Sequence, residues 1–372
     1  MGLRQTDQAI TAFQKQADAN PYDETAYNSL GWAYATARKY DNAATAYGKA
    51  IEINPLSDYA HAALGSMYSE EHQYDKAAPE LEKAVSLKPD NAFLEINLGD
   101  AYLNLGQDDK ALAAFDRAID LSATPEVWNN IAYQLALKKA HLDRAQQYAE
   151  SAVTAVAAAL RNSTLDQLSL RDLGLVLSLD ADWDTLGWVY FSRGDFDKAE
   201  KYVHVAWLLD QHGEIGDHLG QIYEKLGRKD DAIRAYAMAM SGLRPPPETR
   251  SHLAALVGAD SKVTAATDKY RDQGQVERTI KLGKVAEETG SAEFFILLAG
   301  GGSGTSVEGV KFVSGDDKLK VFSEALRSAK YGLTFPDDTP TKILRRGILG
   351  CSKASGECNF VLLLPEDVRS VN

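Results

Sequence analysis

The chain has 372 residues, of which 45% are hydrophobic and 9% aromatic, so its composition supplies a packed core and excludes an intrinsically disordered protein. Its net charge is −13, and residues 276–372 hold 13 basic and 13 acidic residues, so the acidic excess lies before them. This acidity argues against binding to nucleic acid or to an anionic membrane, and the absence of an apolar run of about 18 residues excludes a predicted membrane span.

Residues 6–21 place Ala9 and Phe13 where Ala43 and Tyr47 stand 34 residues later. Ala43 and Tyr47 belong to the second helix of a 34-residue helix-turn-helix unit that recurs along the chain. Residues 6–21 therefore correspond to a second helix, and the matching first helix is absent. A repeat helix without its partner leaves an apolar face uncovered. We therefore expect this sequence to be a fragment, with further repeats or another domain before it in the full protein.

One pattern recurs along the chain with a period of 34 residues, which indicates a helix-turn-helix unit copied in tandem. It consists of Leu-Gly, a tyrosine, an alanine, a large apolar residue, a second alanine and, in two copies, a proline. Its first copies are Leu30-Gly31, Tyr34, Ala43, Tyr47, Ala50 and Pro55; Leu64-Gly65, Tyr68, Ala77, Leu81, Ala84 and Pro89; and Leu98-Gly99, Tyr102, Ala111, Phe115 and Ala118. These residues resemble the tetratricopeptide repeat (TPR) family, whose units stack side by side.

The resemblance predicts an α-solenoid of TPR helix-turn-helix repeats over residues 1–258. We place the half repeat at 6–21 and full repeats at about 24–57, 58–91, 92–124, 125–160, 180–212 and 213–245. A leucine-rich insertion at 161–181 is expected to form one or two short helices that pack on the solenoid. Aspartates that open second helices are interpreted as N-caps: Asp41, Asp75 and Asp108-Asp109.

Three consecutive prolines from Pro245 end the array. The segment 248–257 is expected to be a capping helix that closes the last apolar face. Residues 259–277 are polar with a helical pattern, and we interpret them as a linker helix to a second domain.

Residues 278–372 change period and predict a small α+β domain of order β-β-α-β-β-β. Its expected strands are the apolar run 294–298, the alternating stretch around Val310, the extended segment 331–335, and a hairpin of 343–351 with 358–364. Turns are expected at 300–304, 336–338 and 352–357. A further strand at 279–282 is the one addition that we consider.

The strand order of this last domain, with Ser314-Gly315 after a strand and Phe335-Pro336 after the helix, resembles the C-terminal domain of TonB-type proteins. That family pairs a partner's strand with a sheet edge. The repeats also resemble the C-terminal half of bacterial, often exported, transglutaminase-like/TPR multidomain proteins, through 129–133, 183–188 and 216–220. That resemblance would place a catalytic domain outside this chain.

In the TPR family, the first helix of each unit lines a concave groove. Transferred to this sequence, the groove positions are Asn28, Trp32, Tyr59, Phe93, Asp100, Asn104, Asn129, Tyr133, Asp184, Trp188, Phe191 and Asp217. Aromatic side chains are common binding hot spots, and asparagine can bond a peptide backbone as donor and acceptor. The alternative is that some of these aromatics only fill space between helices. Lysine and arginine are absent from these positions, which excludes an acidic C-terminal tail as the expected ligand.

Cys351 and Cys358 are the only cysteines, and the predicted hairpin sets them opposite each other. Opposed residues of a non-hydrogen-bonded pair can reach disulfide distance. We favour a disulfide, which predicts an oxidising compartment such as the bacterial periplasm or cell envelope. The alternative is two reduced thiols and a cytoplasmic protein.

No motif predicts catalysis, a cofactor or a metal. The glycine-rich stretch 300–304 lacks the Lys-Ser/Thr of a phosphate-binding loop. His212 and His218 have no further ligands near them in the sequence, and we interpret them as repeat-surface residues.

The leading hypothesis is therefore a non-catalytic scaffold that binds a protein or peptide, basic or apolar by preference, in the TPR groove. The C-terminal domain would be a second docking surface. The alternatives are the non-catalytic part of a larger exported transglutaminase-like or peptidase-like enzyme, and a solenoid that associates with copies of itself.

Overall fold

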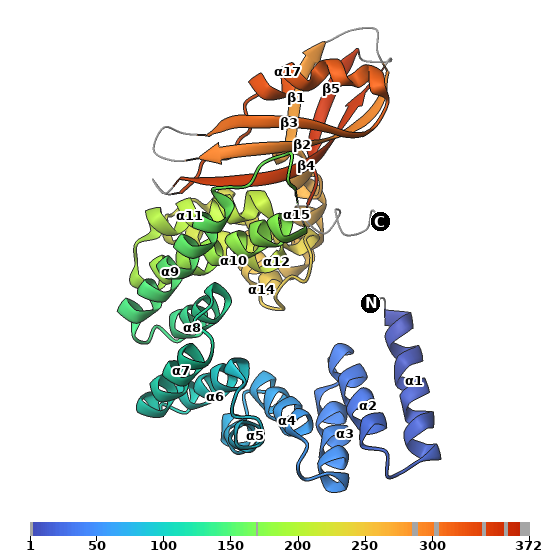
Figure 1. Cartoon of the computed structure of the whole chain (residues 1–372), viewed down its shortest axis with the longest axis vertical. Helices are drawn as coiled ribbons and strands as arrows, with labels where there is room; N and C mark the ends of the chain where they lie inside the picture. The colour runs from blue at the N-terminus through green and yellow to red at the C-terminus, as the bar shows by residue number, and fades with distance from the viewer. Residues whose placement is uncertain are drawn as a thin grey trace. The chain divides into compact units, whose positions relative to one another are not determined.

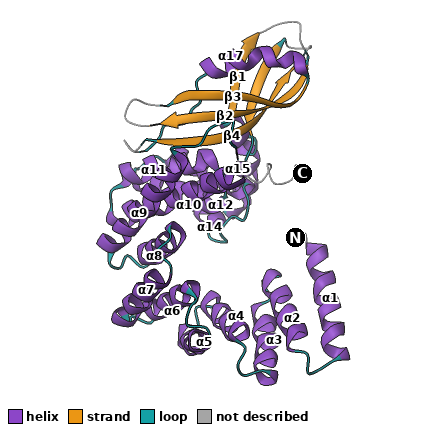
Figure 2. Cartoon of the chain, viewed as in Figure 1, coloured by secondary structure: helices purple, strands orange, loops and turns teal. Residues whose placement is uncertain are grey.

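The computed structural model of the chain describes residues 3–168, 170–284, 289–300, 305–336, 340–352 and 356–364. Its internal contacts divide the chain into two compact units, residues 1–134 and 135–372, and each unit is described by itself. Figure 1 labels the helices and strands, and Figure 2 separates the helical part from the strands by colour.

The first unit is entirely helical. Its helices are α1 (Leu3–Ala19), α2 (Glu24–Thr36), α3 (Tyr40–Ile53), α4 (Asp58–Glu70), α5 (Tyr74–Leu87), α6 (Ala92–Asn104), α7 (Asp108–Leu121) and α8 (Pro125–Leu137), whose last residues enter the second unit. Within each repeat the two helices pack together, as α2 does on α3, and each second helix packs on the first helix of the next repeat, as α3 does on α4. The predicted solenoid of helix pairs is confirmed.

A glycine in α2, α4 and α6 sets how closely the two helices of a repeat approach. A Cβ atom at Gly31 would lie 2.7 Å from the Tyr47 ring, and one at Gly99 would lie 2.4 Å from the Phe115 ring. Tyr47 and Phe115 are both fully buried. The Leu-Gly of the repeated pattern is therefore a packing requirement, because no other residue leaves room for the large side chain of the second helix.

The helix caps differ from the expected ones. The second helices α3, α5 and α7 begin after Lys39, Gln73 and Gln107, none of which caps with its side chain, and the predicted aspartates lie in the first turn instead. The first helices carry the capping side chains. Asp23 accepts a hydrogen bond from the backbone of Ala26, and residues 57 and 91 repeat this arrangement at intervals of 34.

The second unit continues the helix pairs and then adds a sheet. Its helices are α9 (Leu142–Leu160), α10 (Leu170–Arg193), α11 (Phe196–Leu209), α12 (Gly213–Lys225), α13 (Lys229–Ser241), α14 (Thr249–Val257), α15 (Val263–Tyr270) and α16 (Gln273–Glu277), with a short 3₁₀ helix, η1 (Asp260–Lys262), before α15. The leucine-rich insertion does not form separate helices. Its second half is continuous with the first helix of the next repeat, and together they form α10, which is 24 residues long.

Residues 259–277 are packed against the repeats. Val263 of α15 is buried, and α15 contacts α13. The Gln211 side chain donates to the backbone oxygen of Gly274 at 2.9 Å, and the Trp207 indole donates to Glu277 at 3.1 Å. This segment is therefore attached to the ends of α11 and α13, and the sheet follows directly from it.

The C-terminal sheet has five antiparallel strands in the order β1-β5-β4-β2-β3. They are β1 (Thr279–Lys284), β2 (Gly290–Gly300), β3 (Ser306–Gly315), β4 (Thr341–Cys351) and β5 (Glu357–Leu362). Between β3 and β4 lie η2 (Asp317–Phe322) and α17 (Ser323–Ser328), which contact β2 and β3. The predicted α+β domain is confirmed, although parts of the turns at 300–304, 336–338 and 352–357 lie outside the described residues.

The strand order differs from the prediction at one place, residues 331–335. The additional strand is present as β1, and residues 331–335 do not pair with any described strand, so the order is β-β-β-α-β-β. Tyr331, Leu333 and Phe335 are buried in alternation, as in a strand. The Phe335 ring packs edge-on against Trp183 of α10, with ring centroids 6.0 Å apart. The alternating side chains of this segment are buried against α10 and one face of the sheet, without backbone pairing to a described strand.

Contacts of the insertion join the sheet to the helices of this unit. The Lys311 ammonium of β3 donates to the backbone oxygen of Leu165 at 2.8 Å, and a Cβ at Gly309 would lie 2.5 Å from the Leu165 side chain. The Thr341 hydroxyl of β4 donates to the Ala157 oxygen of α9 at 3.4 Å. The leucine-rich segment was predicted to pack on the solenoid, and part of it packs on the sheet instead.

Candidate partner-binding surface

The first helices of the unit formed by residues 1–134 carry a row of exposed aromatic side chains. Trp32 of α2 is 44% exposed, Tyr59 of α4 is 50% exposed and Phe93 of α6 is 43% exposed. In Figure 1, α2, α4 and α6 lie on the inner side of the curve of this unit, and α3, α5 and α7 lie on its outer side. Trp32 and Tyr59 line one hollow, and large aromatics that remain this exposed mark a surface suited to contact with another molecule.

The charges of this unit are segregated between its two sets of helices. Residues 1–134 contain 20 acidic and 10 basic residues. All of the basic residues lie on α1, α3, α5 and α7 or in turns, and α2, α4, α6 and α8, which the structure describes throughout, contain no lysine or arginine. Among the described residues no cation pairs with Glu24, Glu70 or Glu126, whereas Glu95 is held by Arg117 at 2.8 Å. The inner surface is therefore acidic as well as aromatic.

A hollow of about 460 Å³ opens between α1, α2 and α4. It is lined by Phe13, Thr25, Asn28, Ser29, Trp32 and Tyr59. Its volume falls in the range of roughly 300–1,000 Å³ that is typical of ligand pockets. Phe13, Thr25 and Ser29 were not among the predicted groove residues, and the signal that pointed to Phe13 was its place in a half repeat.

Glu24 holds Asn28, one of the polar residues that line this hollow. Its carboxylate accepts hydrogen bonds from the Ser57 hydroxyl, from the Asn54 amide at 2.7 Å and from the Asn28 amide at 3.2 Å. These hydrogen bonds, that from Ser57 first, lower the pKa of Glu24 and keep it ionised. The same carboxylate therefore joins α2 to the start of α4 and places a negative charge next to Asn28.

The predicted groove asparagines are already engaged in part. The Asn104 amide donates to the Asp100 carboxylate at 2.9 Å, and Asn28 donates to Glu24. The Oδ1 atoms of Asn28, Asn104 and Asn129 are buried and have no hydrogen-bond partner among the described residues. The remaining position of this unit, Tyr133, is half-buried.

The predicted groove residues of the second unit are buried. Trp188 is 8% exposed, Phe191 9%, Asp184 7% and Asp217 4%. The Trp188 ring stacks on Phe191 at a centroid distance of 4.5 Å and on His218 at 4.0 Å. These aromatics fill space between first helices, which was the alternative interpretation of the pattern.

His218 is not a surface residue, contrary to the prediction. It is 4% exposed, and its Nδ1 lies 2.9 Å from the Asp184 carboxylate, which joins α12 to α10. Burial alone would lower the pKa of His218, but the Asp184 carboxylate outweighs it and raises the pKa. A similar histidine–aspartate contact lies one helix pair further along, where His252 of α14 lies 3.0 Å from Asp217 of α12. His212 is half-buried and its ring nitrogen accepts from the backbone of Glu214.

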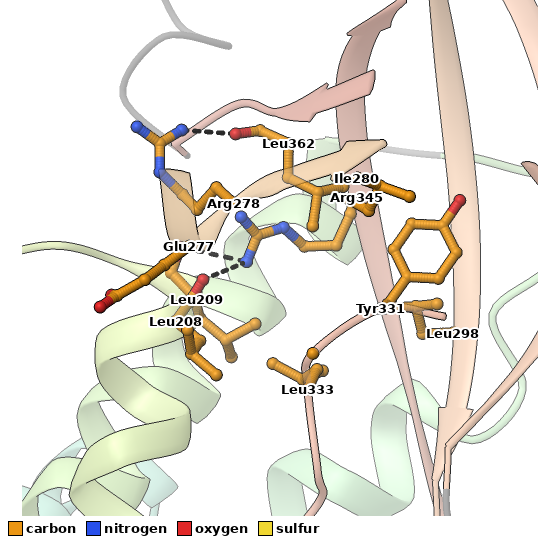
Figure 3. A pocket seen from close by; sticks show the side chains of 11 residues that line it. Leu208, Leu209, Glu277, Arg278, Ile280, Leu298, Tyr331, Leu333, Arg345 and Leu362 are labelled. Carbon is orange, nitrogen blue, oxygen red and sulfur yellow. Dashed lines mark hydrogen bonds between the residues drawn. The ribbon is translucent and has the colours of Figure 1, made fainter. Parts of the chain in front are cut away.

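Figure 3 shows a second place, where the sheet meets the end of α11. The guanidinium of Arg345 is buried and donates to the backbone oxygens of Leu208 at 3.3 Å, Leu209 at 3.2 Å and Leu363 at 3.1 Å. Burial lowers its pKa to about 10, so it stays charged at neutral pH. The cavity beside it measures about 20 Å³, too little for a ligand. Arg345 therefore serves to attach β4 to the helices.

Cys351 and Cys358 are directly opposed across the β4–β5 hairpin, as the sequence predicts. Their sulfur atoms are joined at 2.05 Å and their Cα atoms lie 4.1 Å apart. Within the described part of the chain, no cluster of three or more acidic, histidine or cysteine side chains could hold a metal ion. None of its helices is long and apolar enough to cross a membrane.

Comparison with protein families decides the nature of the repeats. Family models described as tetratricopeptide repeat match residues 24–57, 68–132 and 217–251. These segments are tetratricopeptide repeats. The matched segments fall in both units, and no enzyme family was matched. A search of curated proteins returned no match.

One solved structure supports the TPR fold, and two others are reported for their similarity alone. A tetratricopeptide repeat protein from Parabacteroides merdae is 15% identical, with a TM-score of 0.52 over 67% of this chain and 90% of that chain. MamA is 25% identical over 40% of this chain and 86% of that chain, with a TM-score of 0.36. YrrB, described as a TPR protein with an unusual peptide-binding site, is 17% identical over 70% of this chain and 100% of that chain, with a TM-score of 0.32.

Proposed function

We propose that this TPR protein is a non-catalytic scaffold that binds an extended or helical protein segment along the inner surface of residues 24–134. The observation that carries the proposal is the row of exposed aromatics, Trp32, Tyr59 and Phe93, on helices that contain no lysine or arginine. Exposed aromatics supply contact area at low entropic cost, and an acidic surface favours a basic or apolar partner.

The proposal is narrower than the groove expected from sequence. Asp184, Trp188, Phe191 and Asp217 contact one another or their neighbours in the interior of the second unit, so we assign them a packing role. Asn28, Asp100, Asn104, Asn129 and Tyr133 flank the aromatic row and would contact the backbone of the bound segment.

A selection from a library of displayed 12-residue peptides on the immobilised chain tests the proposal. We expect selected peptides to lose at least about tenfold in affinity on Trp32→Ala or Tyr59→Ala, because each removes an exposed aromatic contact. Tyr22→Ala is the matched control, since Tyr22 is 83% exposed but lies in the turn before α2. Selected peptides that bind both variants as tightly as the unchanged chain would contradict the proposal.

Other predictions about this protein stay predictions. They are a docking role for the C-terminal domain, its TonB-type resemblance, the relation to transglutaminase-like proteins, self-association, and a periplasmic or cell-envelope location. The Cys351–Cys358 disulfide supports an oxidising compartment. Light scattering of the purified chain tests self-association directly.

A further inference from the structure

We propose that the hollow between α1, α2 and α4 is an anchor site for an arginine or lysine side chain of the bound segment. This inference rests on the proposed function and specifies the contact that anchors the segment. Three aromatic side chains from three helices border the hollow: Phe13 from α1, Trp32 from α2 and Tyr59 from α4. A cation placed against aromatic faces is attracted by their negative quadrupole, most strongly by tryptophan.

Other aromatic rings of the repeats are covered by lysine or arginine side chains of the chain itself. Tyr102 is covered by Lys110 at 4.8 Å and Tyr190 by Lys198 at 4.9 Å, each from the helix that follows, and Tyr223 is covered by Arg228, the residue before α13. Among the described residues no cation covers Phe13, Trp32 or Tyr59. These are the rings that remain available to a cation from a partner.

Phe13 differs from its counterparts in the other repeats. Tyr47, Leu81 and Phe115 hold the same repeat position and are at most 2% exposed, because a first helix covers each of them. Phe13 is half-buried and lines the hollow. The ring therefore forms a wall of the hollow.

The polar side of the hollow also favours a cation. Asn28 lies at its edge and is bonded to the ionised Glu24, which no lysine or arginine of the described residues neutralises. Three aromatic walls without a resident cation, two of them on helices whose only charged side chains other than histidine are acidic, are complementary to a positively charged side chain.

Three fluorescein-labelled 12-residue peptides of Gly, Ser and Ala with four evenly spaced guest residues test the assignment. The guests are arginine, citrulline, which has the shape of arginine without its charge, or norleucine. Binding to the whole chain is measured by fluorescence anisotropy at 0.15 M salt. We expect the arginine peptide to bind about tenfold or more tightly than the citrulline peptide, and more tightly than the norleucine peptide.

Variants separate the hollow from general attraction to an acidic protein. Trp32→Leu keeps the charge and the apolar character of the site but removes its best ring, so we expect about fivefold or greater loss for the arginine peptide. Trp32→Phe should retain part of the affinity, and Tyr22→Leu should leave it unchanged. Circular dichroism and the melting temperature of each variant establish that it is folded.

The outcomes distinguish this inference from the proposed function. If the norleucine peptide binds at least as tightly as the arginine peptide and is weakened by Trp32→Leu, the hollow is an apolar anchor, and only the cation assignment is overturned. If the arginine peptide binds but Trp32→Leu has no effect, attraction is diffuse and the anchor site is overturned. If library-selected peptides also ignore Trp32, the proposed function itself fails.

Discussion

At the scale of single residues, a missing methyl group determines how the repeats pack. Gly99 leaves room for the ring of Phe115, and a Cβ at this position would lie 2.4 Å from it. Gly48 of α3 has no atom within 4 Å of an added Cβ, so it marks a position where glycine is not required. The two positions together separate steric effects from helix propensity.

Gly99→Ala should lower the free energy of unfolding by about 1–3 kcal/mol, because the added methyl group overpacks a buried contact. Gly48→Ala should raise it by roughly 0.5–1 kcal/mol, since alanine is the better helix former. Urea unfolding followed by circular dichroism measures both. Equal effects of the same sign at the two positions would contradict the packing argument.

Asp182 of α10 is a buried carboxyl whose Oδ2 atom has no hydrogen-bond partner among the described residues. Burial raises its pKa to about 8, whereas an unfolded chain ionises aspartate near pH 4. Between these values the folded state holds a proton that the unfolded state has released. The contribution of Asp182 to the free energy of unfolding is therefore fully present below about pH 4 and is lost as the pH rises toward 8.

Asp182→Asn should remove this dependence and stabilise the chain at pH 7 by on the order of 2 kcal/mol. The melting temperature measured from pH 4 to pH 8 should fall less for the variant than for the unchanged chain. Asp197→Asn, an exposed change on α11, should shift stability by no more than about 0.5 kcal/mol at any pH. Parallel pH curves for Asp182→Asn and the unchanged chain would refute the prediction.

At the scale of elements, one buried arginine joins the sheet to the helices of its unit. Arg345 donates to the last carbonyls of α11, which lack partners within the helix, and its positive charge complements the negative end of that helix. Removing it would leave buried carbonyl groups without donors, each at a cost of about 1–3 kcal/mol.

Arg345→Met should therefore destabilise the chain by roughly 2–4 kcal/mol and increase cleavage by thermolysin between residues 259 and 278. Arg327→Met is the control, because Arg327 of α17 is about half exposed and makes one hydrogen bond, to the Glu308 oxygen. Cleavage that rises equally in both variants would show that Arg345 does not hold the sheet in place.

The helices were predictable because the same small and large residues recur every 34 residues and pack in the same way, as Gly31 does against the Tyr47 ring. Capping was not predictable from the aspartates, since residues 23, 57 and 91 repeat at the same interval and cap the first helices instead. Residues 331–335 alternate like a strand, but they pack against α10 and the sheet without pairing to a described strand. Alternation in the sequence indicates that one side of a segment is buried. The element that covers this side is known only from the tertiary structure.

The candidate site was predictable only in part. Trp32, Tyr59 and Phe93 are exposed, as the groove interpretation requires. Trp188 occupies a related position but stacks between Phe191 and His218, a contact that depends on the Asp184–His218 pair. Repeat position predicts the face of a residue, and its neighbours decide whether it remains accessible.

At the scale of the molecule, charge is distributed unevenly along the chain. Residues 1–134 carry 10 of the 13 excess negative charges, and their inner helices hold no compensating cation. Such a surface attracts a basic partner at a rate that falls as salt is added. The proposed binding surface therefore lies on the inner helices of this unit and not on the repeats in general.

Hydrogen–deuterium exchange of the whole chain, with and without the tightest library-selected peptide, tests this account most directly. The account predicts slower exchange in residues 24–36, 58–70 and 92–104, with little change in 40–53 and 74–87 of the outer helices. Slower exchange confined to the outer helices or to the sheet at 279–362 would contradict it.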